Sequence, residues 1–156
     1  MLEQTIPAVK AALHRGRDRL RAAAALPEDR PAAALAAPDR ALLERYVDRF
    51  NARDFDAIRD MLADEVRLEV VGRARLAGPA EIRGRYLHNY ALAADWHLSL
   101  GAVEGRPVLV ARDPADAAGT VSYVVQVAWA RGRLTEIRDF RYARYITEDA
   151  TIGALT

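Results

Sequence analysis

Asp139 is the side chain of this sequence best suited to acid–base chemistry. Residues 133–145 alternate as a β-strand does, so Ile137, Asp139 and Arg141 share one face. If that face is turned inward, burial raises the pKa of the Asp139 carboxyl and lets it give or take a proton near neutral pH. The alternative is structural: Asp139 pairs with Arg141 or another arginine and fixes the walls of a pocket.

The three histidines are weaker candidates for the same chemistry. His97 falls in a predicted strand, where it is either a base or a structural hydrogen-bonding group. His14 belongs to a basic N-terminal helix and is solvated or faces DNA, and His88 falls on a helix surface or a pocket rim. The sequence has no cysteine, which excludes disulfides, thiolate metal sites and a cysteine nucleophile. It shows no metal-ligand spacing, glycine-rich phosphate loop or Ser-His-Asp arrangement, so we expect neither a metal nor a cofactor.

The first 25 residues predict a basic helix with Pro7 in its first turn. Val9, Leu13 and Leu20 fall near one face, and basic side chains crowd the rest. If this helix docks on DNA, its basic residues contact phosphates and give salt-dependent affinity; the candidates are Lys10, His14, Arg15 and Arg17. In the alternative interpretation it packs its apolar face on the neighbouring domain or another subunit, or is disordered.

Composition limits the class of protein. The chain has 156 residues, of which 51% are hydrophobic and 29% charged, which is enough for one domain with a core of its own. A net charge of +1 argues against nucleic-acid binding by the chain as a whole. No apolar run reaches the roughly 20 residues of a membrane span, and no signal peptide is visible, so we expect a cytoplasmic protein without membrane contact.

The elements that must position Asp139 follow an Ala/Pro-rich stretch. We expect the basic helix over 1–25, a semi-rigid linker over 26–38, an α+β domain over 39–146, and a tail without a pattern over 147–156. Asp39 is predicted to cap the first helix of the domain. A second helix begins near Phe55, and Gly78-Pro79 opens a third over 80–93. Strands are predicted over 66–71, 95–103, 107–112, 120–130 and 133–145.

Helices followed by a run of strands predict an α+β fold with the helices on one face of an antiparallel sheet. A strongly curved sheet of this kind forms a cone with an apolar interior, and such concavities are where ligands bind. We therefore expect an apolar small-molecule pocket lined by Tyr46, Phe50, Met61, Tyr86, Tyr90, Trp96, His97, Ile137, Asp139 and Arg141. We also expect the outer sheet face to pair two subunits as a homodimer.

Three segments resemble the SnoaL-like branch of the nuclear transport factor 2-like superfamily. Residues 43–58 look like its opening helix pair, 76–82 like its strand-to-helix corner, and 130–141 like its closing hairpin. The resemblance covers about two-thirds of the chain and implies the cone fold. In SnoaL-like enzymes an acidic residue at the place of Asp139 often faces the cavity and acts as an acid or base. The epoxide-hydrolase branch adds an Arg-x-Asp on the first long strand, and this chain has none in Asp95–Leu100.

Residues 7–17 resemble the end of the recognition helix in region 4 of extracytoplasmic-function sigma factors. A helix-turn-helix needs a preceding helix, and only Met1–Gln4 stand before Thr5, so we expect this chain to begin within a DNA-binding unit. Some sigma factors of this type carry a SnoaL-like domain after region 4. The resemblance implies a regulatory or ligand-sensing domain whose partners, RNA polymerase and promoter DNA, belong to a full-length sigma factor. The alternative is a small isomerase, cyclase or dehydratase that uses Asp139.

Overall fold

The computed structural model describes residues 35–93, 96–116, 120–145, 152–153 and 155. All of them belong to one of two units of the chain, residues 32–156; the other unit, residues 1–31, lies outside the described residues. The predicted basic helix and its DNA-binding candidates Lys10, His14, Arg15 and Arg17 therefore lie outside them too. In the described part of the chain, no helix is long and apolar enough to cross a membrane.

Within the described residues, helices α2 (Ala37–Asn51) and α3 (Phe55–Asp60) come first, and both were predicted as the opening helices of the domain. The prediction that Asp39 caps α2 is wrong. Ala36 stands at the N-cap, Pro38 sits in the first turn, and the Asp39 carboxylate instead accepts a hydrogen bond from Trp129 Nε1 at 2.7 Å. The helix thus begins inside the predicted linker, because a proline is compatible with a first turn although it interrupts a helix interior.

Among the described residues, seven strands form one curved sheet in the order β2-β1-β6-β5-β4-β3-β7. Their bounds are β1 Leu62–Val70, β2 Ala74–Ala77, β3 His97–Val103, β4 Arg106–Arg112, β5 Tyr123–Ala130, β6 Arg133–Asp139 and β7 Ile152–Gly153. The α+β fold is confirmed, but the sheet is mixed rather than wholly antiparallel, because β1 and β6 run parallel. The expected last strand over 133–145 ends at Asp139, and residues 152–153 of the expected tail pair with β3.

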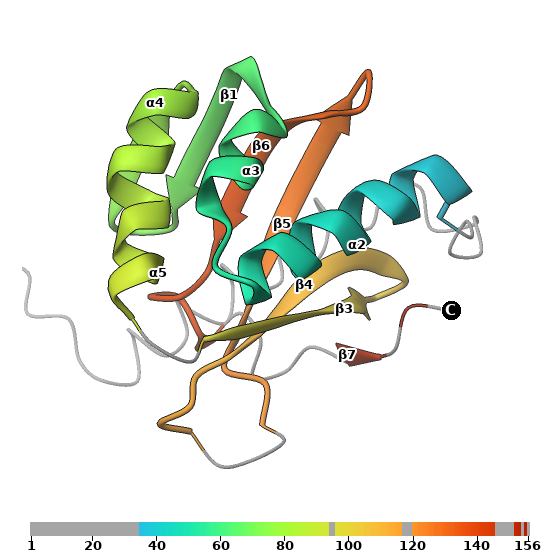
Figure 1. Ribbon diagram of the computed structural model, residues 1–156. Coiled ribbons are helices and arrows are strands. Elements are labelled where there is room, and N and C mark those ends of the chain that lie inside the picture. Colours follow the sequence, from blue (N-terminus) through green and yellow to red (C-terminus); the bar gives the residue numbers. More distant parts are fainter. Residues whose placement is uncertain (1–34, 94–95, 117–119, 146–151, 154, 156) are drawn as a thin grey trace, which may run out of the picture. The chain divides into compact units, whose positions relative to one another are not determined.

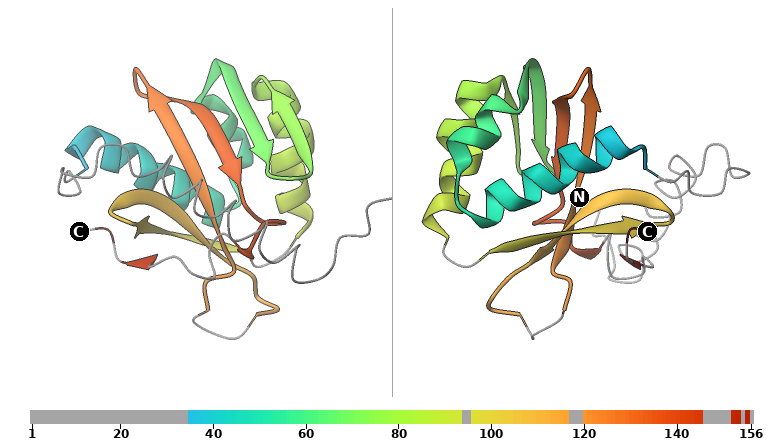
Figure 2. Two further views of the ribbon diagram at one scale, coloured as in Figure 1. Left: turned by 180° about the vertical axis from the view of Figure 1, so that it is seen from behind. Right: turned by 45° about the vertical axis from the view of Figure 1, so that its right-hand side comes forward.

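The helix between β2 and β3 has three parts: α4 (Pro79–Glu81), a π-helical segment η1 (Ile82–Leu87) and α5 (His88–Leu92). Gly78, at φ 84°, and Pro79 start it as expected. This helix, α2 and α3 all lie on one face of the sheet (Figures 1 and 2). Their apolar side chains and those of the inner sheet face form the main core.

A second, smaller apolar cluster lies on the outer face of the sheet. Its buried members alternate along β4 and β5 with residues of the main core, as strand geometry requires. They are Val108, Val110, Val124, Phe140 and Ala143. The segment after β6 therefore folds partly over the outer face, and Asp139 is the last residue of the strand before that change of course.

Candidate functional site

Asp139 is buried at the C-terminal end of β6, with only 1% of its surface exposed. Its register partners are Val70 in β1 and Val125 in β5, so it sits inside the sheet rather than at an edge. Ile137 lies two residues earlier and is fully buried on the same inner face, as the alternation predicts. The expected carboxylate thus faces the apolar interior of the domain.

Tyrosine hydroxyls surround this carboxylate. Tyr86 and Tyr90 both donate hydrogen bonds to Asp139 Oδ2, at 2.6 Å and 2.7 Å. The backbone N–H of Arg141 donates to Oδ1 at 2.8 Å. The Tyr90 hydroxyl is also hydrogen-bonded to that of Tyr123. Three tyrosines and one aspartate therefore form a continuous buried network.

The helix before β3 places the first two tyrosines. Tyr86 lies in η1 and Tyr90 in α5, four residues apart, and this spacing puts both side chains on the face that meets the sheet. Their rings pack edge to face with centroids 5.2 Å apart. Tyr123 opens β5 and reaches the same point from the sheet.

Burial dominates the electrostatics of this network. It raises the pKa of the Asp139 carboxyl, although the two tyrosine hydroxyls and the Arg141 amide lower it in part. Burial and the charge of Asp139 raise the pKa values of Tyr86 and Tyr90, so both stay protonated donors. The arrangement can hold a carboxylate as a hydrogen-bond acceptor or hold a neutral acid that donates a proton.

Tyr46 on α2 adds an unusual hydroxyl. Its side chain is 1% exposed, and its hydroxyl has no hydrogen-bond partner within the part of the chain that the structure describes. Burial first and the charge of Asp139 second raise the pKa of Tyr46. A buried hydroxyl without a partner is destabilising, and such groups commonly mark a place for water or a ligand atom.

The sequence left open an ion pair between Asp139 and Arg141 or another arginine. The described residues show a hydrogen bond from the Arg141 backbone to the Asp139 carboxylate but no ion pair, and the charge of Arg141 lowers the pKa of that carboxyl. The guanidinium carbon instead lies 4.5 Å from the ring centroid of Trp96 and 5.5 Å from that of Tyr90. Aromatic faces, rather than a carboxylate, hold this side chain.

The structure gathers most of the predicted pocket residues but not all. Those buried around the inner face are Tyr46, Phe50, Met61, Tyr86, Tyr90, Trp96, Ile137 and Asp139. His97 is exposed, so its place in the pocket is wrong: Trp96 and Leu98 point inward, and alternation along β3 turns His97 outward. Tyr123 is not among the predicted pocket residues, although its position two residues before Val125 on the same strand was a usable signal of an inward side chain.

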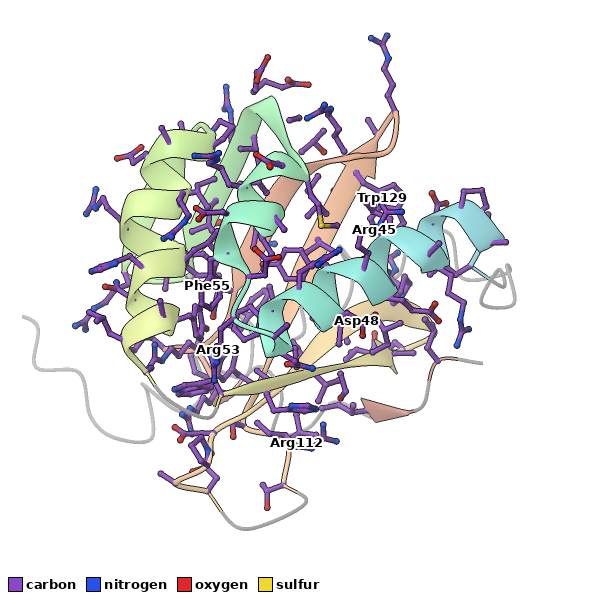
Figure 3. All side chains as sticks on the ribbon, viewed as in Figure 1. Arg45, Asp48, Arg53, Phe55, Arg112 and Trp129 are labelled. Atoms are coloured by element: carbon purple, nitrogen blue, oxygen red, sulfur yellow. The ribbon has the colours of Figure 1, made fainter. Side chains whose placement is uncertain are left out.

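Two polar side chains, one at the end of α2 and one in the turn after it, hold the beginning of β3 against this site. The Asn51 amide both donates to Leu98 O and accepts from Leu98 N, each at 2.9 Å. Arg53, in a left-handed conformation at φ 62°, donates to Tyr90 O and Trp96 O (Figure 3). Helix α2 thereby fixes Trp96 and Tyr90 relative to the sheet.

A groove of about 450 Å³ lies elsewhere, on the outer side of β1, β2 and β6. Its lining mixes both signs of charge and includes Arg67, Glu69, Arg75, Glu81 and Glu136. None of the ten predicted pocket residues contributes to it. Within the described residues, no group of three or more acidic, histidine or cysteine side chains could hold a metal ion.

A model of the SnoaL-like domain family matches residues 43–138, more than half of the chain. A comparison with curated protein sequences finds no match. Among solved structures, the chain is similar to an NTF-2-like protein of unknown function from Burkholderia xenovorans LB400. The identity is 17%, with 64% of this chain and 78% of that chain covered, and the TM-score is 0.50.

Two further similarities are to provisionally assigned enzymes. One is a ketosteroid isomerase from Kribbella flavida DSM 17836, at 22% identity over 64% of this chain and 73% of that chain, with a TM-score of 0.46. The other is a polyketide cyclase from Sinorhizobium meliloti, at 18% identity over 62% and 91%, with a TM-score of 0.49. At these identities, the similarity to the Burkholderia protein supports the fold alone.

Proposed function

This chain belongs to the SnoaL-like domain family, and we propose that its domain is a regulatory or ligand-sensing module rather than an enzyme. More specifically, it is the C-terminal module of an extracytoplasmic-function sigma factor. The observation that carries the first part is the closed environment of Asp139, whose two oxygens accept three hydrogen bonds from within the domain.

A general base must reach the proton that it removes, within hydrogen-bond distance or through one water. Asp139 is 1% exposed, and Tyr86 and Tyr90 both occupy its Oδ2 atom. A substrate would have to displace at least one tyrosine and part of the aromatic wall. An interior that opens when a ligand enters couples binding to a change of shape, which is what a sensing domain requires.

The sigma-factor part of the proposal is motivated by residues 7–17 and by the Ala/Pro-rich stretch before the domain. In that context RNA polymerase and promoter DNA are the partners, and the domain modulates promoter binding through protein contacts or a bound small molecule.

Transcription tests this proposal. The gene that encodes this chain, with any coding sequence upstream of Met1, is expressed beside a promoter reporter, with and without residues 39–146. We expect the deletion to change promoter output. Immunoblots confirm equal protein levels, and Arg45→Gln on the exposed side of α2 serves as a control that should leave output unchanged. Identical output with and without the domain under all conditions would contradict the regulatory role.

A second candidate is a small isomerase, cyclase or dehydratase that acts on an apolar cyclic substrate. The specific observation in its favour is the buried Tyr46 hydroxyl, without a partner among the described residues and close enough to Asp139 for its charge to act there. The test is α-proton exchange of apolar cyclic ketones in D₂O, followed by NMR. Catalysed exchange that Asp139→Asn abolishes would support an enzyme; equal exchange with both proteins would remove Asp139 from that role.

A further inference from the structure

Two arginine side chains meet at one exposed tyrosine ring beside the buried site. The guanidinium carbon of Arg73 lies 4.6 Å from the ring centroid of Tyr142, and that of Arg141 lies 5.6 Å from the same centroid. Arg141 also lies over Trp96, at 4.5 Å. The Tyr142 side of this cluster is open to solvent, since 53% of Tyr142 is exposed.

Neither arginine has a carboxylate partner among the residues that the structure describes. Other arginines nearby do: Arg138 pairs with Glu69 at 3.3 Å, and Arg144 pairs with Asp113 and Asp116. The charge of Arg141 acts on Asp139 and lowers the pKa of its carboxyl, but the two Asp139 oxygens accept hydrogen bonds from tyrosines and a backbone amide. Contact with a ring face leaves the in-plane N–H donors of a guanidinium free.

The sheet fixes these groups in place. Val70 and Asp139 are register partners in the parallel pair β1–β6, so the turn after β1 and the segment after β6 start side by side. Val71 N donates to Asp139 O at 2.9 Å, and Arg141 N donates to Asp139 Oδ1 at 2.8 Å. The segment after β6 also passes the C-terminal end of α5 (Figures 1 and 2), where Arg141 meets Tyr90.

We propose that Arg73, Arg141, Tyr142 and Trp96 form a binding site for a small molecule that carries a carboxylate or phosphate on an aromatic or apolar body. The guanidinium donors bind the oxyanion, and the exposed ring of Tyr142 receives the apolar body. Trp96, which is 6% exposed, contributes the ring over which Arg141 lies. This site deepens the proposed ligand-sensing role and rests on it, because it names the chemical class of the ligand.

Trp96 reports on the site directly. The chain has two tryptophans, so Trp129→Phe leaves Trp96 as the single fluorophore. The full chain with this substitution is titrated with benzoate, phenylphosphate and the neutral analogue benzamide. We expect saturable changes in Trp96 fluorescence with benzoate or phenylphosphate and none with benzamide. The tighter of the two anions identifies the oxyanion as carboxylate or phosphate.

Substitutions that remove one arginine charge provide a second test of the site. Arg141→Gln should weaken binding of the preferred anion by about tenfold, because charge-assisted hydrogen bonds are lost. Arg73→Gln should weaken it less, since Arg73 lacks the contact with Trp96. Arg45→Gln makes the same change of charge on exposed α2 and should leave the affinity unchanged (Figure 3). Circular dichroism confirms that each variant is folded.

Equal responses to benzoate and benzamide would overturn the site, as would an Arg141→Gln variant with unchanged affinity for both anions. These binding results can be distinguished from a failure of the proposed regulatory function. If deletion of residues 39–146 changes transcription while neither anion binds, the oxyanion site is wrong and the regulatory role stands. If the anions bind at Arg141 while that deletion has no effect, the site stands and the regulatory role is wrong.

Discussion

A single buried acid makes the stability of this domain depend on pH in an unusual direction. Burial raises the pKa of Asp139 in the folded state, whereas the unfolded chain keeps an ordinary value near 3.8. Between these two pKa values the folded protein binds more protons than the unfolded one, so stability falls as pH rises through that window.

Asp139→Asn should remove this dependence. The variant loses one hydrogen bond, because the side-chain N–H₂ of the new asparagine would face the backbone N–H of Arg141, and both groups are donors. In return, the variant carries no buried charge at any pH. We therefore expect the difference in unfolding free energy to shift in favour of the variant as pH rises from about 4 to 8. Urea denaturation across that range measures the shift.

Asp56 offers a control of opposite sign. It is exposed, and the Arg83 guanidinium at 2.8 Å holds the pKa of its carboxyl below the ordinary value. Its contribution to stability is present above its unfolded pKa and is lost as pH falls. A difference between wild type and Asp139→Asn that stays constant from pH 4 to 8 would show that Asp139 titrates normally.

Among the described residues, the Tyr90 hydroxyl has two hydrogen-bond partners, Asp139 and Tyr123, whereas the Tyr86 hydroxyl has one, Asp139. Tyr90→Phe removes a donor from Asp139 and also leaves the buried Tyr123 hydroxyl without its partner, so we expect a loss of about 1–3 kcal/mol. Tyr86→Phe removes one hydrogen bond and should cost about 1 kcal/mol. Chemical denaturation of both variants checks the order, and a costlier Tyr86→Phe would contradict the network described above.

The sequence predicts single side chains well where one periodicity governs them. Alternation along 133–139 turned Ile137 and Asp139 inward, and helical spacing brought Tyr86 and Tyr90 to one face. It could not show that both hydroxyls meet at the Asp139 carboxylate, because that depends on how the helix sits on the sheet. His97 shows the reverse error, since Trp96 and His97 are neighbours on a strand and cannot both point inward. The chemical roles of these residues stay predictions.

At the scale of elements, helices and most strands were predictable, but their pairing was not. The parallel pair β1–β6 joins residues about 70 positions apart in the chain, and no local pattern specifies such a contact. The π-helical turn of η1 and the four-residue strand β2 also lack a strong local signal. These features set the site, because β1 and β6 together hold Asp139 and η1 carries Tyr86.

The antiparallel pair β3–β4 contains a close approach that can be tested. A Cβ added at Gly101 would stand 2.6 Å from Val110 Cγ2 and 3.3 Å from Gly153 O. Gly101→Ala should therefore destabilise the domain by about 1–3 kcal/mol through overpacking. Val110→Ala removes the conflicting methyl, so the double variant should cost less than the sum of the two single changes. A double-mutant cycle by urea denaturation measures this coupling, and strict additivity would contradict it.

At the scale of the whole molecule, the homodimer through the sheet stays a prediction. The outer face presents a row of alternating charges across β2, β1 and β6, in which Glu69 contacts both Arg75 and Arg138. Such a row can meet its own copy about a two-fold axis. Light scattering at micromolar concentration should give about twice the chain mass of 17.2 kDa. The mass should fall toward that of one chain at high salt, because screening weakens exposed charge pairs; a single-chain mass at low salt would contradict the dimer.

The two edge strands of the sheet, β2 and β7, affect how the protein can aggregate. In the described residues the sheet ends at β2 on one side and at β7 on the other. Directly after β2, Gly78 N donates a hydrogen bond to Val66 O. The N–H of Ala77, the last residue of β2, points away from β1, and the Glu81 carboxylate accepts a hydrogen bond from it at 2.9 Å. A glutamate therefore fills the position that an incoming strand would need, and β7 spans only two residues. Both borders thus resist growth by strand addition, the route by which sheet proteins polymerise into fibrils.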